Sequence, residues 1–376
     1  NRKQGYFIQR LNDSSNVIAV CGKNPIGNYY AITTLNQLFD ETQPIYHHTN
    51  VIDYPDFNER GIYLNDSANI LDGIHFLTEN RFNRIYVNAN EGWKQKKNKL
   101  LSQLKKSSVH GELFHPGISV NPYKLNCRGK SDSSHTEINK KALSAVVRND
   151  RNVFSTLLLR MDQTFELKDN CSCLFEFGYE GDYIKYQNLL DVHSQLVNEV
   201  SGWMGQYSSV SIVPPWHNNR CIIRSQGRGE MYLTELSRKV PSEIGFLWTG
   251  PVDHSYVIDE VETSYIRSNY RKKPGFLSLD INPQSNKQFV SHYPGKARMG
   301  SIFGHFNLAL PECFNIITSG QFISELMPNT PVNQIKILTL ANYLWNSKNF
   351  QPDLTLLKVL ISKYGKKTAF NLLKFN

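Results

Sequence analysis

The residues best suited to chemistry lie where an apolar run ends in charge, in LLLRMDQ at 157–163. Three leucines predict a buried strand, and Arg160, Met161 and Asp162 then lead out of it into a polar setting. A carboxylic acid at such a position can donate a proton in a reaction or accept one. Carboxylates that do acid–base work often act in pairs, and no second acid lies in this run. Asp162 is therefore either a catalytic acid or what remains of a site that has lost its partner, and both interpretations stay open.

Further polar residues follow other predicted strands. The predicted strands are RGIYL, FNRIYVN, GELFHPGIS, VFSTLLLRM, VSIVPPW, IGFLWTG and PGFLSLDI. Each polar residue at their ends can bind a ligand, but Asp and Asn at such positions also cap helices and fix loops. Both interpretations stay open for Asn65, Asp66, Asn88, Asn90, His217, Asp253 and Asp280.

Helical patterns separate these strands, and the alternation predicts an α/β fold, a (β/α)8 TIM barrel. We expect the barrel at 53–312, with its site at the carboxyl ends of the strands. A small α/β domain is expected at 1–52, and a helical domain at 313–376. Because the chain begins without Met, we expect the first domain to be incomplete and any targeting signal to lie upstream.

Composition excludes several other classes of protein. The 376 residues are 40% hydrophobic and 12% aromatic, enough for a large core, and no apolar stretch is long enough to span a membrane. The net charge of +9 is spread over short basic runs that are typical of solvated surfaces. No nucleic-acid motif accompanies them, and no His or Cys spacing predicts a metal. We expect no metal or cofactor, and neither compartment nor oligomeric state is indicated.

The order of landmarks resembles the family 84 glycoside hydrolases, the β-N-acetylglucosaminidases that include protein O-GlcNAcases. IAVCGKNPIGNYYAITTLNQLF resembles the last strand and helix of that family's first domain, and VIDYPDFNERGIY the entry to its barrel. The remaining matches follow in family order as FNRIYVN, FHPGIS, DVHSQLVNEV, VPPWHN, FLWTGP, LDINPQSN and LANYLWN. The resemblance implies the barrel fold and a glycan or glycoprotein substrate containing N-acetylglucosamine.

Substrate-assisted hydrolysis is the reaction that the resemblance implies. The 2-acetamido oxygen of the sugar attacks its own anomeric carbon, one carboxylate polarises the amide N–H, and its neighbour protonates the leaving oxygen. The family has two consecutive Asp at the tip of the fourth strand. Here Met161 and Asp162 match that pair, so the resemblance makes Asp162 the general acid and leaves the polarising position to a thioether.

Other positions that bind the sugar in the family also differ. YLND at 63–66 stands where the family has Gly-Phe-Tyr-Gly, and Ala89 lies near its sugar-binding Lys. His217 matches its pocket Tyr, while Ile281 and Asn286 match its last Asn and Asp, unless a one-residue slip brings in Asp280. The residues expected to contact the sugar are His217, Asp280, Asn286, Trp216, Asn65 and Asn90.

Three functions stay open. The first is an active glycosidase in which a second acid, such as Glu176 or Glu180, restores the carboxylate pair. The second is an inactive barrel that binds a glycan or protein, with Trp216, Trp248 and Tyr63 available to stack on sugars. The third is a polyanion-binding protein, which requires the basic runs 94–106 and 271–273 to share one face.

Overall fold

The computed structural model describes most of the chain, and the fold is argued from those residues alone. They are residues 4–11, 17–38, 50–64, 70–89, 93–106, 115–120, 123–125, 136–138, 140–150, 153–161, 182–205, 209–213, 228–248, 269, 271–272, 275–278, 321–324, 330–347 and 349–374.

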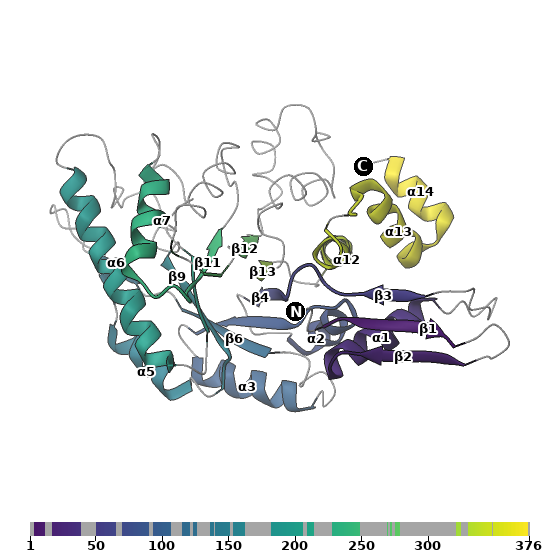
Figure 1. The fold of residues 1–376 in the computed structure, drawn as a ribbon, viewed down its shortest axis with the longest axis horizontal. Coiled ribbons are helices and arrows are strands. Elements are labelled where there is room, and N and C mark those ends of the chain that lie inside the picture. The colour runs from purple at the N-terminus through teal and green to yellow at the C-terminus, as the bar shows by residue number, and fades with distance from the viewer. Residues whose placement is uncertain are drawn as a thin grey trace.

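Eight parallel strands form a closed ring at the centre of the molecule (Figure 1). Each strand pairs with the next one along the chain, and the last pairs with the first. This ring confirms the predicted (β/α)8 fold. In order around the ring, the strands are β4 (Glu59–Leu64), β5 (Arg84–Asn88), β6 (His115–Val120), β9 (Thr156–Arg160), β10 (Ser209–Val213), β11 (Gly245–Trp248), β12 (Gly275–Ser278) and β13 (Gln321–Ser324).

The eighth strand corrects a predicted boundary. β13 pairs with β12 on one side and with β4 on the other, so the ring closes only through it. The barrel therefore extends to at least Ser324, beyond the expected limit at residue 312. The pattern of QFIS is too short and too polar at its ends to stand out from the helical segment expected there.

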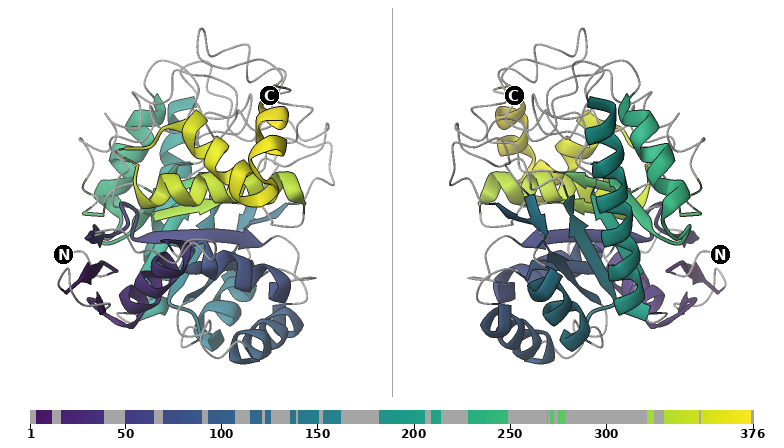
Figure 2. Two further views of the ribbon diagram at one scale, coloured as in Figure 1. Left: turned by 90° about the vertical axis from the view of Figure 1, so that its right-hand side faces the viewer. Right: turned by 90° about the vertical axis from the view of Figure 1, so that its left-hand side faces the viewer.

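Amphipathic helices between the strands cover the outside of the ring. They are α2 (Ile70–Glu79), α3 (Trp93–Lys106), α5 (Lys140–Asp150), α6 (Asp182–Met204) and α7 (Arg228–Lys239). Their apolar faces and the outward side chains of the strands form one large buried cluster. Figure 2 shows the long helix α6 running along the outside of the barrel. α5 begins at Lys140, and before it β8 (Thr136–Ile138) pairs antiparallel with β7 (Tyr123–Leu125).

Smaller elements flank the barrel on the amino- and carboxyl-terminal sides of the chain. Before it, β1 (Tyr6–Arg10) pairs antiparallel with β2 (Ile18–Gly22) and β3 (Val51–Asp53), and α1 (Pro25–Leu38) packs on this sheet. After it come α12 (Pro331–Trp345), α13 (Pro352–Tyr364) and α14 (Lys366–Lys374). Thr330 caps α12 by accepting a hydrogen bond from the backbone N–H of Asn333.

One buried cation, Arg60 of β4, joins these flanking parts to the barrel. Its guanidinium donates to Gln4 Oε1 at 2.8 Å and to the Tyr30 hydroxyl at 3.1 Å, and it lies 5.3 Å from the ring of Trp345. Trp345 Nε1 in turn donates to Asp53 Oδ2 at 2.6 Å. We call this group the Arg60 junction. It connects β4 with Gln4 just before β1 and with α1, β3 and α12.

A buried histidine on α6 makes stability depend on pH. His193 is 1% exposed, and burial lowers its pKa to about 3 from an ordinary value of 6.5. The unfolded chain therefore binds the proton first, and stability is lost as the pH falls below about 6.5. Between pH 7 and pH 5 we expect this group to lower the free energy of unfolding by about 2 kcal/mol.

Urea unfolding at pH 7 and pH 5 checks this prediction. The free energy of unfolding is lower at pH 5 than at pH 7 by an amount that includes the contribution of His193. We expect that difference to be about 2 kcal/mol smaller in His193→Leu. The exposed His75, substituted as His75→Gln, is the matched control and should keep the wild-type difference. An unchanged difference in His193→Leu contradicts the prediction.

Candidate functional site

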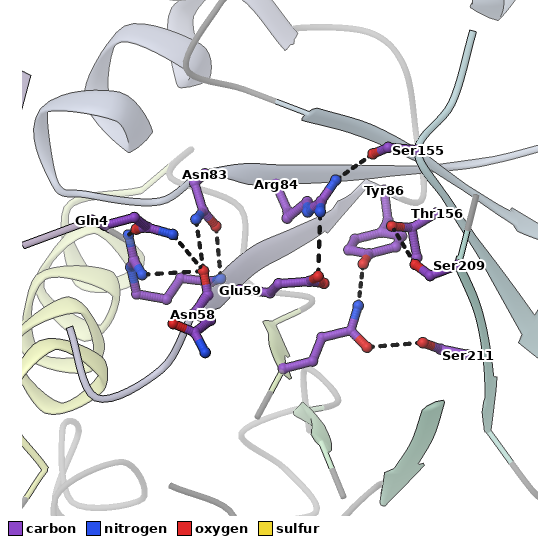
Figure 3. A network of polar contacts seen from close by, with 12 residues as sticks. Gln4, Asn58, Glu59, Asn83, Arg84, Tyr86, Ser155, Thr156, Ser209 and Ser211 are labelled. Carbon is purple, nitrogen blue, oxygen red and sulfur yellow. Dashed lines mark hydrogen bonds and ion pairs between the residues drawn. The ribbon is translucent and has the colours of Figure 1, made fainter. Parts of the chain in front are cut away.

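The amino end of the barrel is closed by an ion pair. Arg84 donates to Glu59 Oε1 at 3.2 Å from the neighbouring strand, and it also donates to the Ser155 hydroxyl (Figure 3). Both side chains of the pair are largely buried. The pair therefore occupies this end of the lumen.

The middle of the lumen is filled by Tyr86. Its ring lies between two glycines on the adjacent strands, and a Cβ at Gly117 would stand 2.6 Å from a ring carbon. The hydroxyl of Tyr86 accepts a hydrogen bond from Gln321, whose side-chain oxygen accepts one from Ser211 at 3.0 Å (Figure 3). Burial raises the pKa of Tyr86, so the phenol stays neutral. Among the described residues, Tyr86 thus closes the lumen toward the amino end, and the carboxyl end is where a ligand is expected to bind.

Toward the carboxyl end, an apolar layer carries a single cation. The layer consists of inward side chains from seven strands, namely Tyr63, Tyr86, Leu158, Val213, Leu247, Leu277 and Ile323. Arg160 is level with Val213 on the neighbouring strand, so it faces the lumen too. Its Cζ lies 5.2 Å from the centre of the Tyr63 ring, although β9 and β4 are not neighbours in the ring. The guanidinium therefore reaches across the lumen, and Arg160 as a whole residue is only 2% exposed.

Two uncharged polar residues face the lumen beside Arg160. Asn88, Ser119 and Leu158 are level on three neighbouring strands, and Leu158 belongs to the inner layer. Ser119 is 1% exposed, and within the described part of the chain its hydroxyl has no hydrogen-bond partner. A buried hydroxyl left in this way costs about 1–3 kcal/mol, which a bound water or ligand group can recover.

Met161 lies on the other side of the strand. It is fully buried and belongs to the outer apolar cluster, together with Leu157 and Leu159 of the same strand. A side chain at this position packs between the barrel and its helices. Its place in the outer layer gives a physical reason for an apolar residue where the resembled family has its polarising Asp.

The predicted site residues lie outside the described residues. The structure therefore neither groups them nor separates them. They are Asp162, His217, Asp280, Asn286, Trp216, Asn65 and Asn90, and the same holds for Glu176 and Glu180.

Tyr63, Ala89 and Asn88 were also considered in the sequence analysis and are described, and Arg160, which it missed as a site residue, lies over the Tyr63 ring. Tyr63 was expected to stack on a sugar. Its side chain is fully buried, and the guanidinium of Arg160 lies over its ring. Ala89 is buried and donates its N–H to the Ser119 carbonyl at 2.8 Å, while Asn88 faces the lumen. Arg160 was not predicted as a site residue. The sequence carried no sufficient signal for it, because β9 is buried on both faces and its run of leucines does not show which face turns inward.

Within the described residues, the basic segments 94–106 and 271–272 do not come together. The first lies largely in α3, which follows β5, whereas Arg271 and Lys272 precede β12. β4 and β13 separate these two strands in the ring. Arg271 is also occupied by an ion pair with Glu243 at 3.1 Å.

A cavity of about 620 Å³ lies away from the barrel strands, on the small sheet. Its described lining comes from residues 5–9, 21–23 and 50–54. Among the described residues, no group of three or more His, Cys, Asp or Glu is placed to hold a metal ion. None of the described helices combines the length and apolarity needed to cross a bilayer.

No protein-family model matches the sequence. Solved structures nevertheless superpose on nearly the whole chain. CpGH84B aligns with a TM-score of 0.59 and 14% identity, over 97% of this chain and 61% of CpGH84B. A mutant of the Thermobaculum terrenum O-GlcNAc hydrolase aligns with a TM-score of 0.56 and 14% identity, over 85% of this chain and 66% of that one.

A third similar structure comes from another glycosidase family. It is the family 20 β-N-acetylhexosaminidase of Streptomyces coelicolor, with a TM-score of 0.58 and 11% identity, over 98% of this chain and 82% of that enzyme. The chain thus has a glycoside-hydrolase-like fold, and it spans less than two thirds of CpGH84B and of the Thermobaculum enzyme.

Proposed function

We propose that this protein is a glycosidase of the β-N-acetylglucosaminidase type, acting on glycans or glycoproteins that contain N-acetylglucosamine. The observation that carries the proposal is the place of β9. It is the fourth strand of the ring, and Asp162 follows it by two residues. In the family 84 glycoside hydrolases that the sequence resembles, the catalytic carboxylates follow the fourth strand.

In this proposal Asp162 protonates the leaving oxygen, while His217, Asp280, Asn286, Trp216, Asn65 and Asn90 contact the sugar. The reaction also needs a carboxylate that polarises the acetamide N–H, and Met161 stands where the family has that residue. A charge-stabilising group of this kind is worth about a hundredfold to a thousandfold in rate. Unless a second acid supplies it, we expect turnover far below that of an intact carboxylate pair.

Hydrolysis of a chromogenic aryl β-N-acetylglucosaminide tests the proposal. Asp162→Asn is expected to lower kcat/KM by about a hundredfold or more, because the general acid is lost. Asp191→Asn is the matched control: this carboxylate lies exposed on α6 in an ion pair with Lys239, so activity should be unchanged. Wild-type turnover that survives in Asp162→Asn contradicts the assigned role.

A second function is favoured by the location of Met161. Met161 packs in the outer apolar cluster, at the position where the family has its polarising Asp. A barrel without that carboxylate can bind a glycan and not hydrolyse it. A wild type that does not hydrolyse the aryl glycoside but binds N-acetylglucosamine disaccharides in calorimetry supports this alternative. A wild type that does neither contradicts both.

A further inference from the structure

The last helix, α14, has one packed face and one exposed face. Ala369 is fully buried, and together with Leu372 and Leu373 it packs against apolar side chains of α12 and α13. Figure 1 shows α14 at the outer edge of this group of helices, farther from the barrel than α12. On its exposed side lie three lysines and an aromatic ring that is 45% exposed, and we call these residues the α14 face: Lys366, Lys367, Phe370 and Lys374.

The three lysines surround the aromatic ring. Residues three or four positions apart are neighbours on the surface of a helix. Lys366 and Lys374 are each four positions from Phe370, and Lys367 is three positions from it. Among the described residues, none of these lysines takes part in a hydrogen bond or an ion pair. The α14 face is therefore one apolar side chain within a ring of unpaired positive charge.

The neighbouring helices supply little negative charge to neutralise this face. Within residues 330–347 and 349–374, which the structure describes, there are six lysines, no arginine and one acid. That acid, Asp353, lies in the first turn of α13. α14 instead follows the last turn of α13, with Gly365 alone between the two helices. The α14 face therefore keeps its positive charge.

The residues of this face do not serve the stability of the helix. Lysines in the first turn oppose the helix dipole, and an exposed phenylalanine gains little from the removal of apolar surface from water. The opposite side of α14 already packs on α12 and α13, so the fold does not need these four side chains. Local choices that disfavour stability are expected where a surface has a function.

We infer that the α14 face docks an acidic polypeptide segment. Carboxylates of the partner pair with the lysines, and an apolar side chain of the partner packs on Phe370. Protein interfaces commonly have an aromatic residue at the centre and polar residues at the rim. Because a helix of this length offers a small area, the complex is weak and transient. The inference concerns a partner of the protein and does not depend on the proposed hydrolysis.

Two other anionic partners fit the face less well. A helix that lies in a lipid surface inserts its whole apolar face, but the apolar face of α14 is occupied by α12 and α13. Only the ring of Phe370 is left to insert. Phosphate groups of nucleic acids are matched best by the planar fork of arginine, and α12, α13 and α14 contain no arginine. An acidic polypeptide is therefore the partner that the face favours.

Fluorescence anisotropy with two labelled peptides tests the inference. One peptide has several glutamates around two leucines, and the other has glutamine in place of each glutamate. We expect the wild type to bind the acidic peptide about tenfold tighter or more, with an advantage that shrinks as salt is raised. Phe370→Ser and Lys367→Glu should each weaken its binding by about tenfold. The exposed Lys23, substituted as Lys23→Glu, is the matched control and should bind like the wild type.

The outcomes decide both the surface and the partner. Equal affinity of the wild type for the two peptides, or binding of neither, overturns the inference. Unchanged binding by Phe370→Ser or by Lys367→Glu overturns the assignment to the α14 face. Tighter binding to phosphatidylserine vesicles or to oligouridylate than to the acidic peptide overturns the choice of partner. Because both side chains are exposed, the variants are expected to fold, which circular dichroism checks. The aryl glycoside assay tests the proposed function separately.

Discussion

Replacing Arg60 by methionine is expected to lower the free energy of unfolding by about 3–5 kcal/mol. The change keeps much of the volume but removes every donor of the guanidinium. The buried Tyr30 hydroxyl then loses its hydrogen bond, as do the half-buried Gln4 Oε1 and Arg81 carbonyl. Trp345 also loses one of the two cations at its ring, since Arg60 lies 5.3 Å from the ring centre, while Arg81 remains at 4.3 Å.

Equilibrium denaturation in urea measures this effect. Arg238→Met is the matched control, since Arg238 lies exposed in the last turn of α7, and it should stay within about 0.5 kcal/mol of the wild type. A loss below about 1.5 kcal/mol for Arg60→Met would mean that the Arg60 junction contributes little beyond packing. A loss of about 3–5 kcal/mol would show that the Arg60 junction stabilises the packing of the flanking elements on the barrel.

Introducing a carboxylate at Met161 is the second change with a large expected effect. In Met161→Asp the charge enters the outer apolar cluster, and we expect a loss of about 4 kcal/mol at pH 7. Burial raises the pKa of such a carboxyl above its unfolded value near 4. The penalty is therefore complete above the folded pKa and diminishes as the pH falls toward 4.

Unfolding at pH 7 and pH 4.5 checks both the size and the direction of this effect. Met161→Leu, which nearly conserves volume, is the control and should cost less than about 1.5 kcal/mol at either pH. The same preparations can be assayed with the aryl glycoside. Gain of hydrolysis by a stable Met161→Asp protein would show that this side chain turns toward the ligand, contrary to its place in the outer cluster.

Much of the fold followed from patterns in single segments. Seven of the eight barrel strands were predicted from apolar runs, and their order placed Asp162 after the fourth. β13 was not predicted, because four residues with polar ends show no clear strand pattern. Its pairing with β4 also depends on contacts between residues more than 250 positions apart. Such pairing is a tertiary property that local patterns do not encode.

The candidate site was less accessible to sequence reasoning, for a reason visible in β9. Its first positions are buried on both faces, so the run of three leucines does not show which face turns inward. Only the register with β6 and β10 assigns Leu158 and Arg160 to the lumen and Met161 to the outside. The charge at the carboxyl end could therefore be recognised only once the ring was known.

The pairing of β13 with β4 also orders events during synthesis. β4 is made early, yet its partner is translated more than 250 residues later, so its edge stays open while most of the barrel is already available to fold. Open strand edges recruit other chains, and contacts so distant in sequence form slowly. α12 follows directly, and Phe57 just before β4 donates its N–H to the Leu344 carbonyl at 3.1 Å. Growing chains are thus most prone to aggregate until this last segment has left the ribosome.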